Sequence, residues 1–222
     1  MEEWMKPFEN CTLCPRKCGV NRSTGKAGAC HVDAQMRVAR AAFHFWEEPC
    51  ISGEEGSGAV LFTGCSLGCV FCQNTEISRG QAGENVSVER LAEIYLNLQE
   101  QGANNINLVT AGHYAPAVAE SLRRAKDMGL QIPVVYNSSG YELPDTLRLL
   151  DGLVDMYLPD MKYMDGELAG KYSHAQNYPV VAKAALEEMV RQCPICEFDE
   201  RGMMKKGVIV RHLLLPGHVR NS

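Results

Sequence analysis

From residue 59 onward, short apolar segments alternate with longer amphipathic ones. The apolar segments cover residues 59–63, 106–110, 133–137, 153–158 and 208–215. Their hydrophobic side chains stand at consecutive positions, which is typical of strands that are buried on both faces of a parallel sheet. The segments between them carry apolar residues at helical spacing, as in the run from Leu91 to Leu98. The alternation predicts an α/β fold in which helices cover a parallel sheet.

Polar residues follow these strands at the point where each one ends. A cysteine-rich loop follows the first strand, and Thr110 and His113 follow the second. Asn137 closes the third strand, and Asp160 and Lys162 follow the fourth. Because the carboxyl ends of parallel strands meet at one edge of a sheet, we expect these side chains to form a functional site together.

The loop after the first strand holds three cysteines in the pattern C-x3-C-x2-C: Cys65, Cys69 and Cys72. Thiolates are soft ligands that match iron and sulfide, so three of them can hold three irons of a 4Fe–4S cube. The fourth iron then stays open for a small molecule. Gly64 and Gly68 let the loop curl closely around a bulky group. Ordinary buried thiols or part of a zinc site are the alternatives, and the spacing favours the cluster.

Four further cysteines near the N-terminus follow the pattern C-x2-C-x3-C-x11-C: Cys11, Cys14, Cys18 and Cys30. Four thiolates satisfy either zinc or an auxiliary Fe–S cluster, and the spacing does not decide between the two. We favour a metal with a structural role, because it would stabilise a loop-rich segment that has little hydrophobic core of its own. Within this irregular segment, residues 36–42 predict one short strand.

The remaining cysteines carry weaker signals. Cys193 and Cys196 form a CxxC pair beside the helix expected over residues 180–191. Such a pair can be redox-active, can supply two metal ligands, or can be incidental, and a lone CxxC favours the incidental reading. Cys50 stands alone.

Composition argues against two classes of partner. The 222 residues carry a formal net charge of −5 and no basic run, so nucleic acid is not expected as a partner. No apolar stretch approaches the roughly 18 residues of a membrane helix. The N-terminus is acidic and lacks the apolar core of a signal peptide. We therefore expect a cytoplasmic protein without membrane association.

The C-x3-C-x2-C loop directly after a strand resembles the radical S-adenosylmethionine (SAM) superfamily. The resemblance implies a partial (β/α)6 barrel of the TIM type. Five strands are visible, so the barrel is expected to be cut short after the fifth. We accordingly divide the chain into a cysteine-rich metal-binding segment, residues 1–58, and a radical SAM partial barrel, residues 59–222.

The resemblance also implies a chemistry. Cys65, Cys69 and Cys72 would bind the 4Fe–4S cluster, and the open iron would bind the amino and carboxylate groups of SAM. A low-potential donor such as flavodoxin or ferredoxin would supply one electron. SAM would then split into methionine and a 5′-deoxyadenosyl radical, which abstracts a hydrogen atom from the substrate.

Further motifs resemble uncharacterised proteins named for pyruvate formate-lyase-activating enzyme. They lie at residues 11–22, 56–58, 136–141, 157–163 and 211–217. The predicted cofactor contacts are six residues near strand ends: Asn74, Thr110, Asn137, Asp160, Lys162 and Arg211. The guanidinium of Arg211 suits the carboxylate of SAM. A surface ion pair for Asp160 and Lys162, and a solvated strand end for Arg211, are the alternatives.

One segment departs from the activating enzymes, which carry two glycines and a glutamate after the second strand to hold the amino group of SAM. Here residues 110–114 read Thr-Ala-Gly-His-Tyr and include no carboxylate. Thr110 or His113 is the candidate replacement. His113 is also a candidate proton donor, with a packed or solvated histidine as the equal alternative.

Two functions stay open. The first is a radical SAM enzyme that abstracts a hydrogen atom from a glycyl radical enzyme such as pyruvate formate-lyase, or from another protein, a peptide or a metabolite. The second is a truncated, non-catalytic Fe–S or zinc protein that retains the cluster site. A nucleic-acid-binding module would need a basic face that this composition does not supply.

Overall fold

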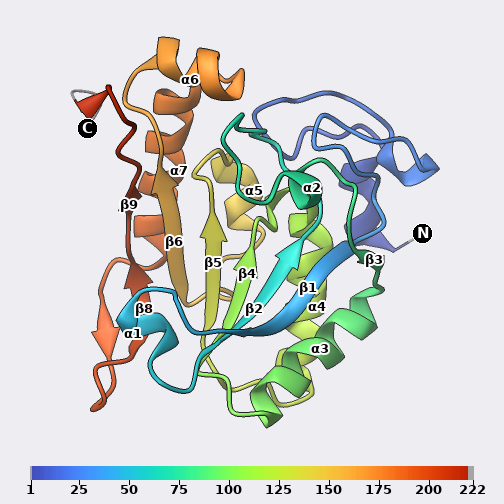
Figure 1. Ribbon diagram of the computed structural model, residues 1–222. Helices are drawn as coiled ribbons and strands as arrows, with labels where there is room; N and C mark the ends of the chain where they lie inside the picture. The colour runs from blue at the N-terminus through green and yellow to red at the C-terminus, as the bar shows by residue number, and fades with distance from the viewer. Residues whose placement is uncertain (1, 220–222) are drawn as a thin grey trace.

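Five parallel strands form the centre of the sheet in the computed structural model, which describes residues 2–219. They are β2 (Ser57–Phe62), β4 (Ile106–Val109), β5 (Val134–Ser138), β6 (Met156–Met161) and β8 (Met204–Val208). Each pairs in parallel with the next in this order. The predicted α/β architecture is confirmed, and Figure 1 shows a partial barrel that is open rather than closed.

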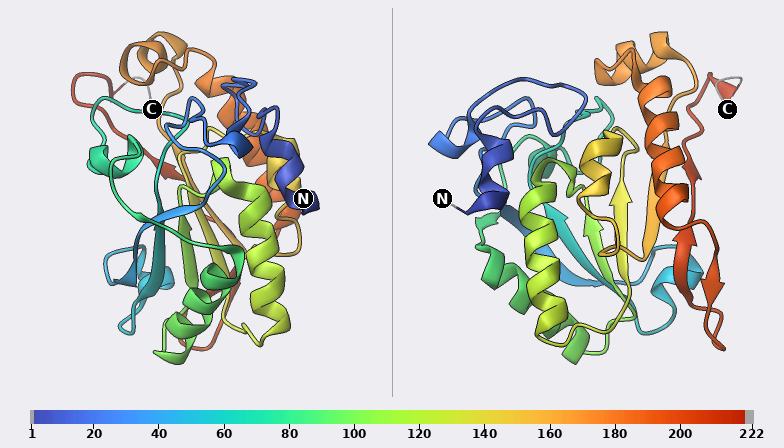
Figure 2. Two further views of the ribbon diagram at one scale, coloured as in Figure 1. Left: turned by 90° about the vertical axis from the view of Figure 1, so that its right-hand side faces the viewer. Right: turned by 180° about the vertical axis from the view of Figure 1, so that it is seen from behind.

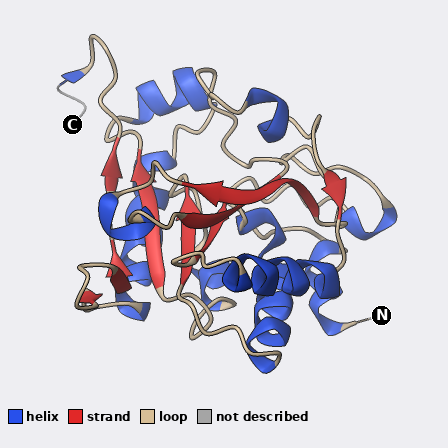
Figure 3. Ribbon diagram, turned by 60° about the horizontal axis from the view of Figure 1, so that its bottom comes forward, coloured by secondary structure: helices blue, strands red, loops and turns tan. Residues whose placement is uncertain are grey.

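Shorter strands extend the sheet at both edges. β1 (Arg37–His44) pairs antiparallel with β2, and β3 (Glu84–Asn85) pairs antiparallel with β1. At the other edge, β7 (Glu197–Phe198) pairs antiparallel with β8, and β9 (Arg211–His212) pairs in parallel with the end of β6. Figure 3 shows how strongly the strand direction turns across the sheet. Because β1 belongs to the sheet, the sheet crosses the proposed boundary at residue 58, and that division stays a prediction.

Four helices cover one face of the sheet, as Figure 2 shows from behind: α3 (Val88–Glu100), α4 (Ala115–Asp127), α5 (Pro144–Arg148) and α7 (Tyr178–Gln192). Ser87 caps α3 by accepting a hydrogen bond from the backbone of Arg90. A proline stands in the first turn of each of the other three. Shorter helical elements are η1 (Glu3–Phe8), η2 (Arg22–Thr24), α1 (Pro49–Ser52), α2 (Thr75–Ser78), η3 (Gly112–Tyr114) and α6 (Gly166–Ser173). No helix within residues 2–219 is both long and apolar enough to cross a membrane.

The largest hydrophobic core lies between the sheet and these four helices. Alternate strand residues such as Phe62 and Leu108 point into it, so their neighbours Leu61 and Asn107 face the opposite, concave side. In Figure 1 the chain that follows β1 passes in front of this concave face on its way to α1. The four helices occupy the opposite face, so the concave face is the side of the sheet that the helices leave uncovered.

The fifth predicted strand has different bounds in the structure. Residues 208–215 do not form one strand, because β8 ends where the prediction begins and β9 follows as a separate short strand. The backbone nevertheless keeps following β6, since the Ile209 N–H donates to the Tyr157 carbonyl at 2.9 Å. β8 begins earlier than predicted because it forms a hairpin with β7, in which Met204 lies opposite Phe198.

Candidate functional site

The cysteine loop joins β2 to α2 at the carboxyl edge of the sheet (Figure 1). Cys65, Cys69 and Cys72 lie on this loop as free cysteines, and each residue is of intermediate burial. Gly64 begins the loop with a φ of +93°, and a Cβ atom there would lie 2.7 Å from the carbonyl oxygen of Cys30. Glycine alone fits this position.

The other two thiols of the loop act electrostatically on Cys65. Burial raises the pKa of Cys65, and the backbone N–H groups of Gly68 and Leu67 lower it. The thiols of Cys69 and Cys72 raise it further. Within residues 2–219, no three His, Cys, Asp or Glu side chains converge closely enough to hold a single metal ion.

Aromatic side chains cover the loop on the side of α6. The ring centroid of Phe71 lies 6.4 Å from that of Tyr163 and 6.3 Å from that of Tyr172. Leu67 is buried in a small core with Tyr163, and two of the three cysteines pack against this core. These side chains keep water from one side of the thiols, and solvent exclusion of this kind tunes the reduction potential of a cluster.

A cavity of about 320 Å³ extends from the end of the cysteine loop along the concave face. It is lined by residues of the loop, β1, β2, β4 and the chain after β1: Arg40, Ala42, Phe43, His44, Glu47, Ala59, Leu61, Gln73, Asn74 and Val109. Its volume is in the range of small-molecule sites. The predicted contact Asn74 stands where the loop and the cavity meet.

Charged and amide side chains gather at the ends of β5, β6 and β9. The pairing of β9 with β6 sets Arg211 opposite Asp160, and Arg211 Nε lies 2.9 Å from Asp160 Oδ1. Lys162 Nζ lies 2.6 Å from Asp160 Oδ2. Arg211 Nη2 donates to Asn137 Oδ1 at 2.5 Å. The structure thus brings four of the predicted cofactor contacts together, bound to one another, and their contact with SAM stays a prediction.

Glu47 connects this polar cluster to the cavity. Its Oε1 accepts from Asn137 Nδ2 at 3.3 Å, and its Oε2 pairs with Arg211 Nη1 at 3.4 Å. Burial raises the pKa of Glu47, and Arg211 lowers it in part. Sequence reasoning missed this carboxylate, because the only local signal is a pair of acidic residues, Glu47 and Glu48, in a stretch without a motif.

Thr110 and His113, the candidate replacements for a carboxylate after the second strand, follow β4. Thr110 has a φ of +60°, and its N–H donates to the Asn137 carbonyl at 2.9 Å. His113 is 3% exposed, and its Nε2 donates to the Thr63 carbonyl at 2.8 Å. Burial lowers the pKa of His113 to about 3, and Arg22 lowers it further, so the ring is neutral. His113 is therefore a packed histidine, and neither residue lines the cavity.

The N-terminal cysteines belong to a segment that packs against the cysteine loop. Cys11, Cys14 and Cys30 are buried, whereas Cys18 is exposed. The backbone N–H of Cys65 donates to the Cys30 carbonyl at 3.1 Å, which joins the segment directly to the loop. The donor set suits zinc or an Fe–S cluster, but the thiols do not converge on one point, so the choice of metal stays a prediction.

The buried Arg22 fastens the same segment to the sheet. Its Nη1 donates to the His113 carbonyl at 2.6 Å and lies 3.6 Å from Cys11 Sγ. The guanidinium also stacks over the rings of Phe8 and Tyr114. Burial raises the pKa of the Cys30 thiol, and the charge of Arg22 lowers it in part.

The CxxC pair lies between α7 and β7, outside the cysteine loop. Cys193 is buried with its Sγ 3.9 Å from the Val154 carbonyl oxygen, and Cys196 is exposed. Neither residue lines the cavity on the concave face. That this CxxC pair is incidental, with no redox or metal-binding role, stays a prediction.

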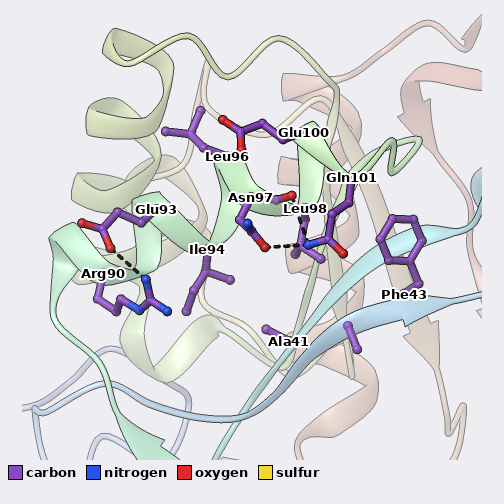
Figure 4. Close-up of a pocket in the computed structure, with 11 residues that line it drawn as sticks. Ala41, Phe43, Arg90, Glu93, Ile94, Leu96, Asn97, Leu98, Glu100 and Gln101 are labelled. Atoms are coloured by element: carbon purple, nitrogen blue, oxygen red, sulfur yellow. Dashed lines mark hydrogen bonds and ion pairs between the residues drawn. The ribbon is translucent and has the colours of Figure 1, made fainter.

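A larger cavity of about 710 Å³ lies between α3 and β1 (Figure 4), and Ala42 and Phe43 line both this cavity and the one on the concave face. Phe43, Ile94 and Asn97 are among its lining residues, and the ion pair of Arg90 with Glu93 stands beside them. None of the predicted site residues lines it. Size alone therefore does not mark the functional site of this protein.

Comparisons with known proteins agree with the geometry of the loop. The family model described as the Radical SAM superfamily matches residues 59–197, which include all three loop cysteines. The curated protein "Uncharacterized protein MJ0674" of Methanocaldococcus jannaschii is 29% identical over 219 residues, which cover 96% of this chain and 59% of that protein. The chain thus spans less than two thirds of that relative. The match to the family model covers more than half of this chain. The chain therefore belongs to the radical SAM superfamily, whose cofactors are a 4Fe–4S cluster and SAM.

Proposed function

We propose that this protein is a radical SAM enzyme in which Cys65, Cys69 and Cys72 bind the cluster and the concave-face cavity receives SAM. One observation carries the proposal. The cysteine loop and the cavity of about 320 Å³ meet at Asn74, at the carboxyl edge of the parallel sheet. A ligand in the cavity would be within reach of the iron that three thiolates leave open.

The side chains around the cavity would bind and orient the cofactor. When bound, the cluster and SAM supply a 5′-deoxyadenosyl radical that takes a hydrogen atom from the substrate. The contact between Arg211 and Glu47, at 3.4 Å, is longer than those of Arg211 to Asp160 and Asn137. The carboxylate of SAM would replace Glu47 there, because a guanidinium binds carboxylates through paired hydrogen bonds.

We further propose a protein as the substrate. The exposed rings of Phe45 and Trp46, the latter 88% exposed, directly precede Glu47 at the cavity. Large exposed aromatic side chains beside a site are typical of surfaces that bind another protein. A glycyl radical enzyme such as pyruvate formate-lyase, whose backbone glycine would lose the hydrogen atom, is the proposed target. Flavodoxin or ferredoxin is the proposed electron donor.

For the N-terminal cysteines we propose a structural metal, either zinc or a second Fe–S cluster. Support comes from the contact between Cys30 and Cys65, which sets this segment beside the cluster loop. A second cluster would be well placed to pass electrons to the first. Metal analysis of the reconstituted protein distinguishes the two, since zinc without extra iron indicates a structural site and additional iron with sulfide indicates a cluster.

The proposed activity is tested by anaerobic reconstitution with iron and sulfide, followed by dithionite and SAM. The product 5′-deoxyadenosine is measured by chromatography. Cys69→Ala removes one proposed ligand, and Cys50→Ala, which alters a partly exposed thiol outside the loop, is the matched control. We expect product from the wild type and from Cys50→Ala but not from Cys69→Ala. No product from a wild type with an intact cluster would favour the non-catalytic alternative.

A further inference from the structure

Arg16 joins the N-terminal segment to the cysteine loop. Its Nε donates to the Ser66 carbonyl at 2.9 Å, and its Nη2 donates to the Leu67 carbonyl at 3.1 Å. The same guanidinium donates to the carbonyl groups of Ser173 and His174 at the end of α6. The last carbonyls of a helix lack partners within the helix and bind cations well. One planar side chain thus connects three segments that are distant in the sequence.

The two loop carbonyls belong to peptide groups whose other side faces a cysteine. A trans peptide group is planar, so its N–H points away from its C=O. The Ser66 carbonyl shares a peptide group with the Leu67 N–H, and the Leu67 carbonyl shares one with the Gly68 N–H. Both N–H groups act on the Cys65 thiol as hydrogen-bond donors. When Arg16 binds the two carbonyls, it therefore aims both N–H dipoles at Cys65.

The rest of the backbone restrains this part of the loop little. The N–H groups of Cys65 and Val70 bind the N-terminal segment and α6, respectively. Between these two anchors, residues 66–68 make no backbone-to-backbone hydrogen bond within the described chain. Arg16 therefore supplies the main hydrogen bonds that fix the orientation of these peptide groups.

We propose that Arg16 is a positioning residue for the cluster: it fixes two peptide groups of the loop so that their N–H groups stabilise the ligand Cys65. This inference rests on the cluster binding proposed above. Hydrogen bonds to the sulfurs and a nearby positive charge both stabilise the reduced state of a cluster, so Arg16 raises its reduction potential.

The test uses the full chain, reconstituted anaerobically and compared at equal iron content. Arg16→Lys keeps the positive charge but loses the planar fork of donors, and Arg16→Ala loses both. Lys17→Ala removes the neighbouring exposed cation and is the matched control. The reduction potential is measured by redox titration of the electron paramagnetic resonance signal that responds to SAM. We expect a more negative potential in both Arg16 variants and the wild-type value in Lys17→Ala. A wild-type potential in Arg16→Lys would overturn the proposal.

Hydrogen–deuterium exchange of the same proteins gives a readout that needs no SAM cleavage. We expect the amides of Leu67 and Gly68 to exchange faster in both Arg16 variants. The amides of α3 and α4 should keep their protection, which shows that the fold is intact. Unchanged exchange at Leu67 and Gly68 in an intact fold would overturn the positioning role. Missing 5′-deoxyadenosine from the wild type would instead count against the proposed function, so the two failures are distinct.

Discussion

Replacing Glu142 by glutamine removes a buried acid whose ionisation the fold opposes. The side chain is 4% exposed, and its Oε2 makes no hydrogen bond within the described residues. The carboxylate packs against Gly112, where a Cβ atom would lie 2.2 Å from Oε2. Burial raises the pKa of Glu142 to about 8, and the Tyr136 hydroxyl offsets only part of this rise. Glu142→Gln keeps the shape and cannot ionise.

The pKa of Glu142 sets both the sign and the size of the effect. The folded value of about 8 lies above the ordinary value of 4.5, so the folded state holds the proton more tightly than the unfolded chain. This group therefore raises the free energy of unfolding below pH 4.5. Its contribution falls as the pH rises towards 8. Each pKa unit is worth about 1.4 kcal/mol, so wild type loses up to about 5 kcal/mol over this interval.

The assay is urea unfolding of the metal-free protein under anaerobic, reducing conditions at pH 5, 6.5 and 8. Glu142→Gln should match the wild type near pH 5 and exceed its free energy of unfolding by several kcal/mol at pH 8, on the order of the loss worked above. Glu54→Gln, an exposed acid, serves as the control and should follow the wild type. Parallel pH curves for Glu142→Gln and the wild type would refute the reasoning.

Three further predictions concern the segments that hold the site. Arg22→Ala should cost about 3 kcal/mol of unfolding free energy, seen as a lower urea midpoint, because two buried carbonyls and one partly buried carbonyl lose their donor. An unchanged midpoint would contradict this. Gly64→Ala should bind far less iron on reconstitution than Gly68→Ala. Both glycines have positive φ, but only at Gly64 would the added Cβ atom meet backbone atoms. Equal iron contents in the two variants would contradict this prediction. Glu47→Gln should lower the dissociation constant for SAM several-fold in calorimetry, because it removes the carboxylate that competes for Arg211. Glu54→Gln should leave the constant unchanged, and equal constants for the wild type and Glu47→Gln would remove Glu47 from the site.

The parallel sheet and the cysteine loop were predictable because both depend on local sequence. Strands that are buried on both faces are apolar along their whole length, so the predicted strand at 59–63 agrees closely with β2. The meeting of Asp160 and Asn137 near one edge follows from the parallel topology, because neighbouring strands end together. The pairing of Asp160 with Arg211 follows from the same topology, since β9 runs parallel to β6.

Other parts of the site depend on contacts that no local pattern encodes. Glu47 binds Asn137 from 90 residues away, and Arg16 binds Ser66 from 50 residues away. The short strand predicted at residues 36–42 is confirmed as β1, but its antiparallel pairing with β2 carries the following chain across the concave face. That pairing is a tertiary property, so the place of Glu47 could not be read from the sequence.

The central claim is that the three loop cysteines hold a cluster with one open iron that binds SAM in the concave-face cavity. Electron–nuclear double resonance of the reduced, reconstituted protein tests it most directly, with SAM carrying ¹⁵N in its amino group and ¹⁷O in its carboxylate. We predict hyperfine coupling from both labels in the wild type and in Cys50→Ala. A reduced cluster that shows no coupling to either label under saturating SAM would contradict the account.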